Sequence, residues 1–236
     1  GILTEVFYPT VDRPQIGDFQ FLVTDGVATF SEQKKDLNSR VSYSNEGMSV
    51  LIEGEDKNGL YELRQEIVAD PRAAVVRIHA RIRLLKNASV YVLFKPAIDG
   101  KGSENYAEIS DGRTLTAFRK GGHAAALASS LPFESASVGY VGTSDGWQDL
   151  SKNMRLTQRE KHAGPGNVAL TAQLDTKRRT VFEVDFALGF GADAQEAQGV
   201  AQLALREPFK RVRESYEEGW NDYLENLSTQ SLSAES

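Results

Sequence analysis

The chain has 236 residues, 40% of them hydrophobic, which is enough to bury a large core. Its formal net charge of −6 argues against a nucleic-acid-binding protein, and no apolar run approaches the roughly 20 residues that a membrane span needs. The absence of cysteine excludes disulfides and a thiol nucleophile. The first residue is Gly1 and no signal peptide is present, so we expect a piece of a longer protein.

Two strands are predicted near the start, from Leu3 to Tyr8 and from Phe19 to Thr24. Pro9 ends the first, because proline lacks the N–H that a sheet ladder needs. Asp25-Gly26 closes the second with a turn typical of hairpins. The opening segment carries three side chains of interest, which are Glu5, Tyr8 and Asp12.

Short strands and turns then alternate as far as Leu188. Asn58-Gly59, Asp99-Gly100 and Asp111-Gly112 are strong hairpin signals, because both turn positions need positive φ. This spacing predicts an all-β fold, a large antiparallel β-sandwich over residues 1–191. The candidate strands are Asn38–Ser44, Met48–Gly54, Leu60–Val68, Ala73–Leu84, Ser89–Ala97, Tyr106–Ser110, Thr114–Phe118, His123–Ala128, Ser135–Val141, Asn167–Leu174 and Thr180–Leu188.

The clearest strand runs from Val75 to Leu84, where apolar and basic residues alternate. Its apolar face is predicted to join the core. Its other face forms a basic ridge of Arg77, His79, Arg81 and Arg83. This ridge is either a solvated outer face or a surface that meets an acidic partner or an anion.

Residues Asp145 to Pro165 are polar and show no clear period, which predicts a long loop with at most a short helical turn. Trp147 favours an ordered loop that makes contacts.

Two helices are predicted after Phe190. Asp193, followed by Glu196 three residues later, resembles a capping box, and Pro208 separates the two helices. The second helix either packs its apolar stripe on the sheet of the same domain or docks part of it on another domain. We expect a helical linker over residues 192–227 and a polar, flexible tail over residues 228–236. The stripe consists of Phe209, Val212, Tyr216, Trp220, Tyr223 and Leu227.

No residue pattern predicts a cofactor. The three histidines are not at metal-ligand spacing, and motifs for a serine nucleophile or a phosphate-binding loop are absent. The sequence leaves calcium binding open, because oxygen ligands from a loop such as Asp145 to Asp149 have no fixed spacing outside EF-hands. The carboxylate pairs nearest aromatic residues are Glu5 with Asp12 and Asp145 with Asp149, and the alternative is that these are turn and cap residues.

Four stretches together resemble the N-terminal domain of bacterial-type glucoamylases and glucodextranases, glycoside hydrolase family 15. The opening stretch reads Glu5, Phe7-Tyr8, Pro9-Thr10, Val11 and Asp12, before a strand that ends in Asp-Gly. The others are Gly139–Leu150, Gly166–Leu170 and the pattern Tyr216…Gly219-Trp220…Tyr223.

The resemblance implies a supersandwich of the galactose-mutarotase type that packs against a downstream catalytic (α/α) barrel through linker helices. The catalytic glutamates of the family lie in that barrel, so this chain is expected to be non-catalytic. The parent enzyme would remove terminal α-linked glucose from glucans with inversion, outside the cell or in the periplasm. The residues expected to face the barrel or its pocket rim are Glu5, Tyr8, Asp12, Asp145, Trp147 and Asp149, and Tyr216, Trp220 and Tyr223 are expected to dock the linker helix.

Two other functions stay open at this point. A carbohydrate-binding module would stack an α-glucan on Tyr8, Tyr140 and Trp147. A stand-alone enzyme on the same sandwich, such as a sugar epimerase, would act through a histidine and a glutamate, although fold alone does not imply this function.

Overall fold

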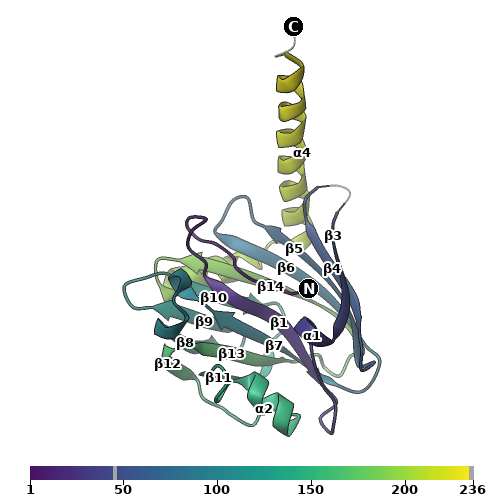
Figure 1. The fold of residues 1–236 in the computed structure, drawn as a ribbon, viewed down its shortest axis with the longest axis vertical. Helices are drawn as coiled ribbons and strands as arrows, with labels where there is room; N and C mark the ends of the chain where they lie inside the picture. The colour runs from purple at the N-terminus through teal and green to yellow at the C-terminus, as the bar shows by residue number, and fades with distance from the viewer. Residues whose placement is uncertain (45–46, 234–236) are drawn as a thin grey trace.

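Two antiparallel sheets stack face to face in the computed structural model, which describes residues 1–44 and 47–233 (Figure 1). The smaller sheet has the order β11 (Phe133–Tyr140), β13 (Val168–Leu174), β7 (Ser89–Pro96), β1 (Ile16–Thr24) and β2 (Phe30–Glu32). The larger sheet has the order β12 (His162–Gly166), β8 (Asn105–Asp111), β9 (Thr114–Arg119), β10 (Ala124–Ser129), β14 (Val181–Gly191), β6 (Val75–Leu84), β5 (Tyr61–Ala69), β4 (Val50–Asp56) and β3 (Leu37–Tyr43). The predicted antiparallel β-sandwich is confirmed.

The main core lies between the sheets. Phe19 and Phe21 of β1 contact Phe186 of β14, with ring centroids 5.4 and 6.0 Å apart. On β6, Ile78, Ala80 and Ile82 are fully buried in this core, as the alternation of that strand predicts.

The opening segment differs from the prediction. In place of a strand from Leu3 to Tyr8, it makes two isolated bridges, Leu3 with Phe19 and Phe7 with Pro14. Glu5 has a φ of 51°, which turns the backbone out of the extended conformation that a strand requires.

Several short elements were not predicted. Besides β2 and β12, they include the single helical turn α1 (Gln33–Asp36) and two 3₁₀ turns, η1 (Ile98–Gly100) and η2 (Gly102–Glu104). The segment expected to be a loop also holds α2 (Gly146–Asn153), an eight-residue helix that packs on the outer face of the smaller sheet. Its Leu150 is buried there together with Leu22 and Tyr91.

The C-terminal helices begin as predicted. Asp193 caps α3 (Ala194–Ala204) by accepting a hydrogen bond from Glu196 N at 2.9 Å, and α3 covers the outer face of β10 and β14. After Pro208, α4 (Phe209–Ser233) leaves the sandwich and projects away from it (Figure 1). The helix therefore continues past Leu227 through residues 228–233, where we expected a flexible tail, and residues 234–236 lie outside the described residues.

Substitutions at two glycines would test how closely α3 packs on the sheet. A Cβ on Gly189 of β14 would lie 2.7 Å from the backbone nitrogen of Ala201, whereas a Cβ on Gly199 of α3 would meet nothing within 4 Å. We expect Gly189→Ala to lower the free energy of unfolding by about 1–3 kcal/mol, because α3 must move outward. Gly199→Ala should raise it by up to about 1 kcal/mol, because alanine favours the helix. Chemical denaturation measures both, and equal effects would contradict this packing.

Candidate functional site

The opening loop is fixed to the sandwich by Tyr8. Its ring stacks on Phe190 with the centroids 5.6 Å apart, and it meets the edge of the His123 ring at 5.5 Å. The backbone is fixed as well, because Tyr8 N donates to Arg13 O at 3.0 Å and Gln15 Nε2 donates to Tyr8 O at 2.5 Å. Tyr8 is therefore an anchor of the loop.

A histidine–carboxylate pair supports this anchor. Asp99 Oδ1 lies 2.6 Å from His123 Nδ1, and Asp99 Oδ2 accepts from His123 N at 3.2 Å. Burial raises the pKa of Asp99, but hydrogen bonds from His123 and Gln15 outweigh it and hold this pKa below its usual value. The sequence showed only the Asp99-Gly100 turn, and nothing in it linked that turn to Tyr8.

The rest of the loop faces outward. Glu5 and Asp12 are exposed, and so are two apolar side chains, Phe7 at 47% and Val11 at 88%. A hydrogen bond from Thr10 lowers the pKa of Asp12, so its carboxyl is ionised at neutral pH. The anchored loop thus presents two apolar side chains to the outside.

The two carboxylates of the Gly139–Leu150 stretch, Asp145 and Asp149, accept hydrogen bonds within the fold. Asp145 accepts from Gln148 N at 2.8 Å as the N-cap of α2. Asp149 accepts from Thr157 Oγ1 at 2.6 Å, from Gln158 N at 3.0 Å and from Asn153 Nδ2 at 2.7 Å. Both residues are 4% exposed. This geometry favours the alternative that they are cap and turn residues.

The aromatic residues proposed to stack on sugars also make internal contacts. Trp147 Nε1 donates to Glu32 Oε2 at 2.9 Å, and the Trp147 ring meets Phe30 edge to face at 5.7 Å. Tyr140 accepts from Gly164 N at 3.1 Å. The opening loop precedes β1 and contacts Phe190 of β14 and His123 just before β10, whereas Trp147 contacts β2. The opening stretch and the Gly139–Leu150 stretch therefore occupy different parts of the sandwich (Figure 1).

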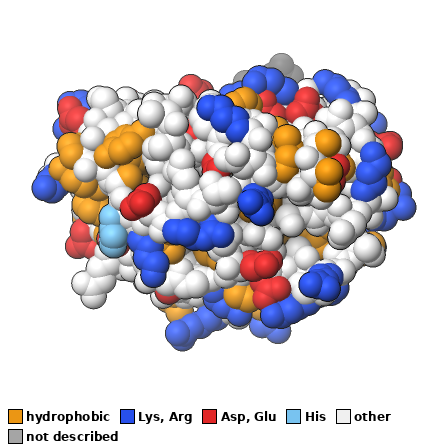
Figure 2. Space-filling model, turned by 90° about the horizontal axis from the view of Figure 1, so that it is seen from below, with side chains coloured by type: hydrophobic (Ala, Val, Ile, Leu, Met, Phe, Trp, Pro, Cys, Tyr) orange, Lys and Arg blue, Asp and Glu red, His pale blue; other side chains and the backbone are white. Residues whose placement is uncertain are grey.

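The basic ridge on β6 is neutralised by neighbouring strands. Arg83 Nε lies 2.7 Å from Glu62 Oε2, and Arg81 Nη1 lies 3.6 Å from Glu183 Oε1. His79 pairs with Asp185 at 2.7 Å and stacks on Phe209, with centroids 5.3 Å apart. These residues thus lie on a face of paired charges, which does not favour the alternative that the ridge meets an acidic partner or an anion. Basic and acidic side chains are also interspersed on the face seen from below (Figure 2).

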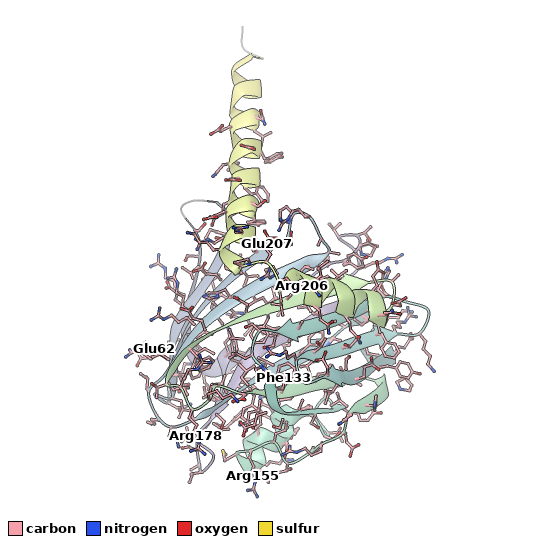
Figure 3. The ribbon with its side chains drawn as sticks, turned by 180° about the vertical axis from the view of Figure 1, so that it is seen from behind. Glu62, Phe133, Arg155, Arg178, Arg206 and Glu207 are labelled. Carbon is pink, nitrogen blue, oxygen red and sulfur yellow. The ribbon has the colours of Figure 1, made fainter. Side chains whose placement is uncertain are left out.

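The base of α4 is held by buried polar groups. Arg77 is fully buried and donates to the carbonyl oxygens of Ala204 at 2.6 Å and Glu207 at 3.1 Å, which ties β6 to the α3–α4 junction. Figure 3 labels Arg206 and Glu207 at this junction. Glu217, 6% exposed, accepts from Ser44 Oγ at 2.9 Å and Ser49 Oγ at 2.8 Å. These bonds fix the direction in which α4 leaves the sandwich.

The apolar stripe of α4 divides into two parts. Phe209 and Val212 are buried against Val68, as expected if the helix packs on its own sheet. Further along, Trp220 contacts both Tyr216 and Tyr223 edge to face, and the three rings line an open apolar hollow of about 330 Å³ with Ala69 and Pro71. Tyr223, Leu224 and Leu227 are 55%, 50% and 46% exposed. This second part is an unpartnered surface on a projecting helix.

Sites for other chemistry are not evident among residues 1–44 and 47–233. No group of three or more histidine and carboxylate side chains there is arranged to hold a metal ion. No helix in that part of the chain is long and apolar enough to cross a membrane.

Comparison with known proteins gives a consistent result. The family model described as glucodextranase, domain N, matches residues 1–225. A glucoamylase from Clostridium sp. (strain G0005) is 27% identical over 235 residues, which are 97% of this chain and 33% of the relative. A crystal structure of a bacterial glucoamylase complexed with acarbose superposes with a TM-score of 0.88 at 26% identity, over 94% of this chain and 34% of that one.

More distant structures share the fold alone. A family GH92 inverting mannosidase from Bacteroides thetaiotaomicron matches with a TM-score of 0.52 at 13% identity, over 89% of this chain and 27% of the mannosidase. This chain thus spans about a third of the length of the glucoamylases that it matches.

The structural role of the Asp149 carboxylate can be tested by measuring the stability of the fold as a function of pH. Burial raises its pKa, but the hydrogen bonds from Thr157, Gln158 and Asn153 outweigh it, so the folded pKa lies below the unfolded one. The stability from these bonds is therefore present above about pH 4 and is lost as the pH falls through the folded pKa. Asp149→Ala should lower the free energy of unfolding at pH 7 by about 2–3 kcal/mol.

Asp149→Asn should in addition flatten the loss of stability below about pH 4, which denaturation curves across pH measure. The exposed Glu160 provides a matched control, and Glu160→Gln should change neither quantity. An Asp149→Asn profile parallel to that of the unaltered chain would contradict the assignment.

Proposed function

The chain belongs to the family of domain N of glucodextranase, and we propose that it is the non-catalytic N-terminal β-sandwich of a glucoamylase-type exo-glycosidase. Its role is to pack against a catalytic barrel that follows it and to hold that barrel in place. The parent enzyme would hydrolyse terminal α-linked glucose from glucans with inversion. The observation that carries this proposal is the projecting helix α4, which is fixed at its base and bears an unpartnered aromatic surface.

The geometry of α4 supports the role. Its first turns are attached through Arg77 and Glu217, so the helix leaves the sandwich in a defined direction. The helix then projects away from the sandwich (Figure 1). Along it, Tyr223 is 55% exposed, and Tyr216 and Trp220 are half-buried. Tyrosine and tryptophan are enriched at buried protein interfaces, because they bury large areas with few rotatable bonds.

The opening loop offers a second contact surface for the barrel. Its base is held by Tyr8 and His123, while Phe7, Val11 and Asp12 face outward. We propose that this loop faces the barrel or the rim of its pocket. The same rim role for Trp147 stays a prediction, and the buried carboxylates of Asp145 and Asp149 do not support it.

The carboxylate geometry supports a non-catalytic domain. An inverting glycosidase needs two carboxyl groups on opposite sides of a sugar bond, with room for a water molecule. Asp145 and Asp149 are instead saturated by hydrogen bonds within their own segment. Tyr8, Tyr140 and Trp147 are likewise engaged internally, so they do not favour a carbohydrate-binding platform. His79 and His123 pair with aspartates and not with a glutamate, which does not favour an epimerase.

The docking role of the aromatic surface of α4 can be tested by replacing its aromatic side chains in the longer protein that we propose. Trp220→Ala combined with Tyr223→Ala should weaken the interdomain contact by about 2 kcal/mol or more, as for aromatic hot spots. We expect a lower melting temperature of the catalytic domain and faster thermal loss of glucose release from maltooligosaccharides. Leu203→Ala is the matched control, because Leu203 is 62% exposed on α3 and lies outside the stripe. A double variant that melts and hydrolyses like the unaltered protein would refute the docking role.

A further inference from the structure

Four turns and the end of one helix form the end of the sandwich that lies away from α4. Three of the turns are joined by backbone hydrogen bonds, since Leu85 N donates to Leu60 O at 2.8 Å and Leu84 N donates to Thr180 O at 2.7 Å. We call this surface the distal end. It consists of residues 25–29, 57–60, 85–88, 151–155 and 175–180.

The first turn and the end of α2 adjoin the other three turns. Thr24 pairs with Ser89 in the register of β1 and β7, and its Oγ1 donates to Met154 O at 3.2 Å. Figure 3 labels Arg155 and Arg178 at the end of the molecule opposite α4. Strands of 9 and 10 residues, β5 and β6, run between the two ends, which are therefore about 30 Å apart.

The distal end is positively charged, although the whole chain has a net charge of −6. Its five segments contain seven lysine and arginine residues but two carboxylates, and both carboxylates are bound within their own turns. Asp25 Oδ1 accepts from three backbone N–H groups at 2.9 Å, and Asp175 pairs with Lys177 at 2.5 Å. All seven cations are exposed, and they are Lys57, Lys86, Lys152, Arg155, Lys177, Arg178 and Arg179.

The adjoining strand ends place carboxylates next to these cations, and acidic side chains are interspersed on the face seen from below (Figure 2). Asp56 is buried, and Glu62 Oε2 accepts from Arg83 Nε at 2.7 Å. Glu55 and Glu134 are exposed. When all five groups are included, the end has eight cations and six carboxylates, so it remains positive.

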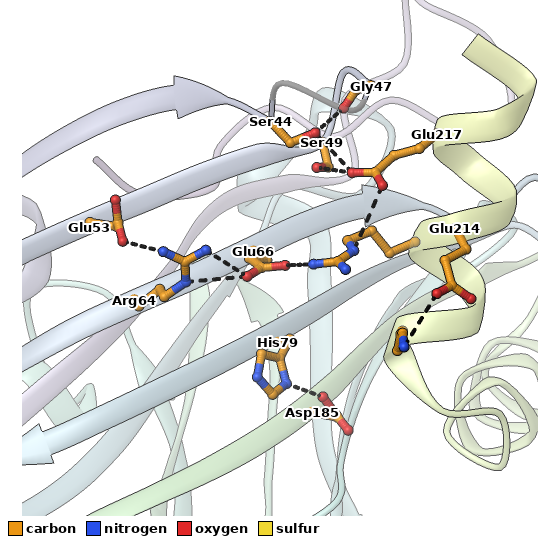
Figure 4. Close-up of polar contacts among 12 residues, drawn as sticks. Ser44, Gly47, Ser49, Glu53, Arg64, Glu66, His79, Asp185, Glu214 and Glu217 are labelled. Carbon is orange, nitrogen blue, oxygen red and sulfur yellow. Dashed lines mark hydrogen bonds and ion pairs between the residues drawn. The ribbon is translucent and has the colours of Figure 1, made fainter. Parts of the chain in front are cut away.

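Most of the seven cations have no acidic partner. Within residues 1–44 and 47–233, Lys177 alone among them forms an ion pair. Lys57 and Lys86 donate to backbone carbonyl oxygens at 2.6 and 3.1 Å. At the base of α4, by contrast, Arg64 pairs with Glu66 at 3.2 Å (Figure 4). The positive charge of the distal end is therefore accessible to an anionic partner.

An uncharged apolar tip stands among these cations. Residues 26–28 read Gly-Val-Ala and are all exposed, with Val27 at 82%, and Leu85 on a neighbouring turn is 39% exposed. A soluble polyanion would leave these aliphatic groups in water. A phospholipid surface offers anionic headgroups to the cations and an apolar boundary to the tip.

We propose that the distal end binds an anionic phospholipid surface, with Val27 inserted where the headgroups meet the acyl chains. Each lysine or arginine close to such a surface raises the affinity about fivefold. The acidic groups at the α4 end do not oppose binding, because about 30 Å is several times the screening length of about 8 Å at physiological salt.

This orientation leaves α4 free. The helix projects from the end opposite the lipid, so it would point away from the surface together with any domain that follows it (Figure 1). The inference rests on charge and exposure at the distal end and is independent of the proposed function.

Sedimentation of the 236-residue chain with lipid vesicles tests the proposal. Vesicles of phosphatidylglycerol and phosphatidylcholine in equal parts should bind the chain saturably at about 0.1 M salt and at least tenfold more weakly at about 0.5 M. Vesicles of phosphatidylcholine alone should not bind it. Val27→Ser should weaken binding to the anionic vesicles about threefold or more, because the tip would lose its apolar contact.

A matched pair of triple variants separates local charge from net charge. Lys86→Gln, Arg155→Gln and Arg178→Gln together should weaken binding about a hundredfold. The control combines Arg13→Gln, Lys101→Gln and Arg206→Gln, which remove the same charge from exposed positions outside the distal end and should leave affinity within about twofold. If the distal triple variant does not fold, Arg178→Gln alone should weaken binding about fivefold.

Three results would overturn the proposal. The first is no binding to the anionic vesicles at about 0.1 M salt, and the second is equal affinity of the distal and control variants. The third is binding of soluble polyphosphate as tight as that of vesicles, with no effect of Val27→Ser, which would assign the surface to a polyanion. None of these results affects the docking role of α4, which is measured in the longer protein.

Discussion

The stacking of the five-stranded sheet on the nine-stranded sheet is the constraint on which the rest of the molecule depends. Phe19 and Phe21 meet Phe186 at the centre of this interface, and the strands that carry them also carry the peripheral features. β1 leads back to the opening loop, and β14 leads forward into α3. Because buried aromatic rings fix the two strands relative to each other, the two candidate contact surfaces keep a fixed separation.

Buried polar groups transmit this rigidity to the exit of the chain. Arg77 is on the outer face of β6, where the sequence suggests a solvated or anion-binding residue, yet it is fully buried beneath the α3–α4 junction. A buried guanidinium costs desolvation, and hydrogen bonds from Nη1 and Nη2 of Arg77 to the carbonyl oxygens of Ala204 and Glu207 offset part of that cost. Glu217 satisfies two serine hydroxyls of the β3–β4 segment in the same way. The sandwich thereby defines the direction of α4, which is what a supporting domain must do.

Much of the fold could be predicted from the sequence, because period-two alternation and Asn-Gly or Asp-Gly turns are local signals. The strand from Val75 to Leu84 and the helix capped by Asp193 followed from such patterns. The prediction of a strand from Leu3 to Tyr8 was wrong, because Glu5 adopts a positive φ that its residue type does not predict. The helix α2 was missed because eight mostly polar residues carry too little periodicity, and β12 because Gly164, Pro165 and Gly166 are unusual in a strand.

The candidate site was less predictable, because its features are long-range. The neutralised ridge depends on the register that places Glu62 opposite Arg83 and Asp185 opposite His79. The anchor of the opening loop joins Tyr8 to His123, and the carboxylate of Glu66 joins Arg64 to Arg213 at the base of α4. These pairs are 115 and 149 residues apart in the chain, by subtraction of their residue numbers. The resemblance to a family predicted the role of the domain, and the structure was needed to show which side chains are exposed and which are buried.

The central claim is that this chain supports catalysis without performing it. The most direct measurement is glucose release from maltooligosaccharides and dextran by this chain and by a longer protein that also contains the proposed barrel. The account predicts release by the longer protein alone. Release by the 236-residue chain itself would contradict it, because a carboxylate pair within these residues would then carry out the hydrolysis.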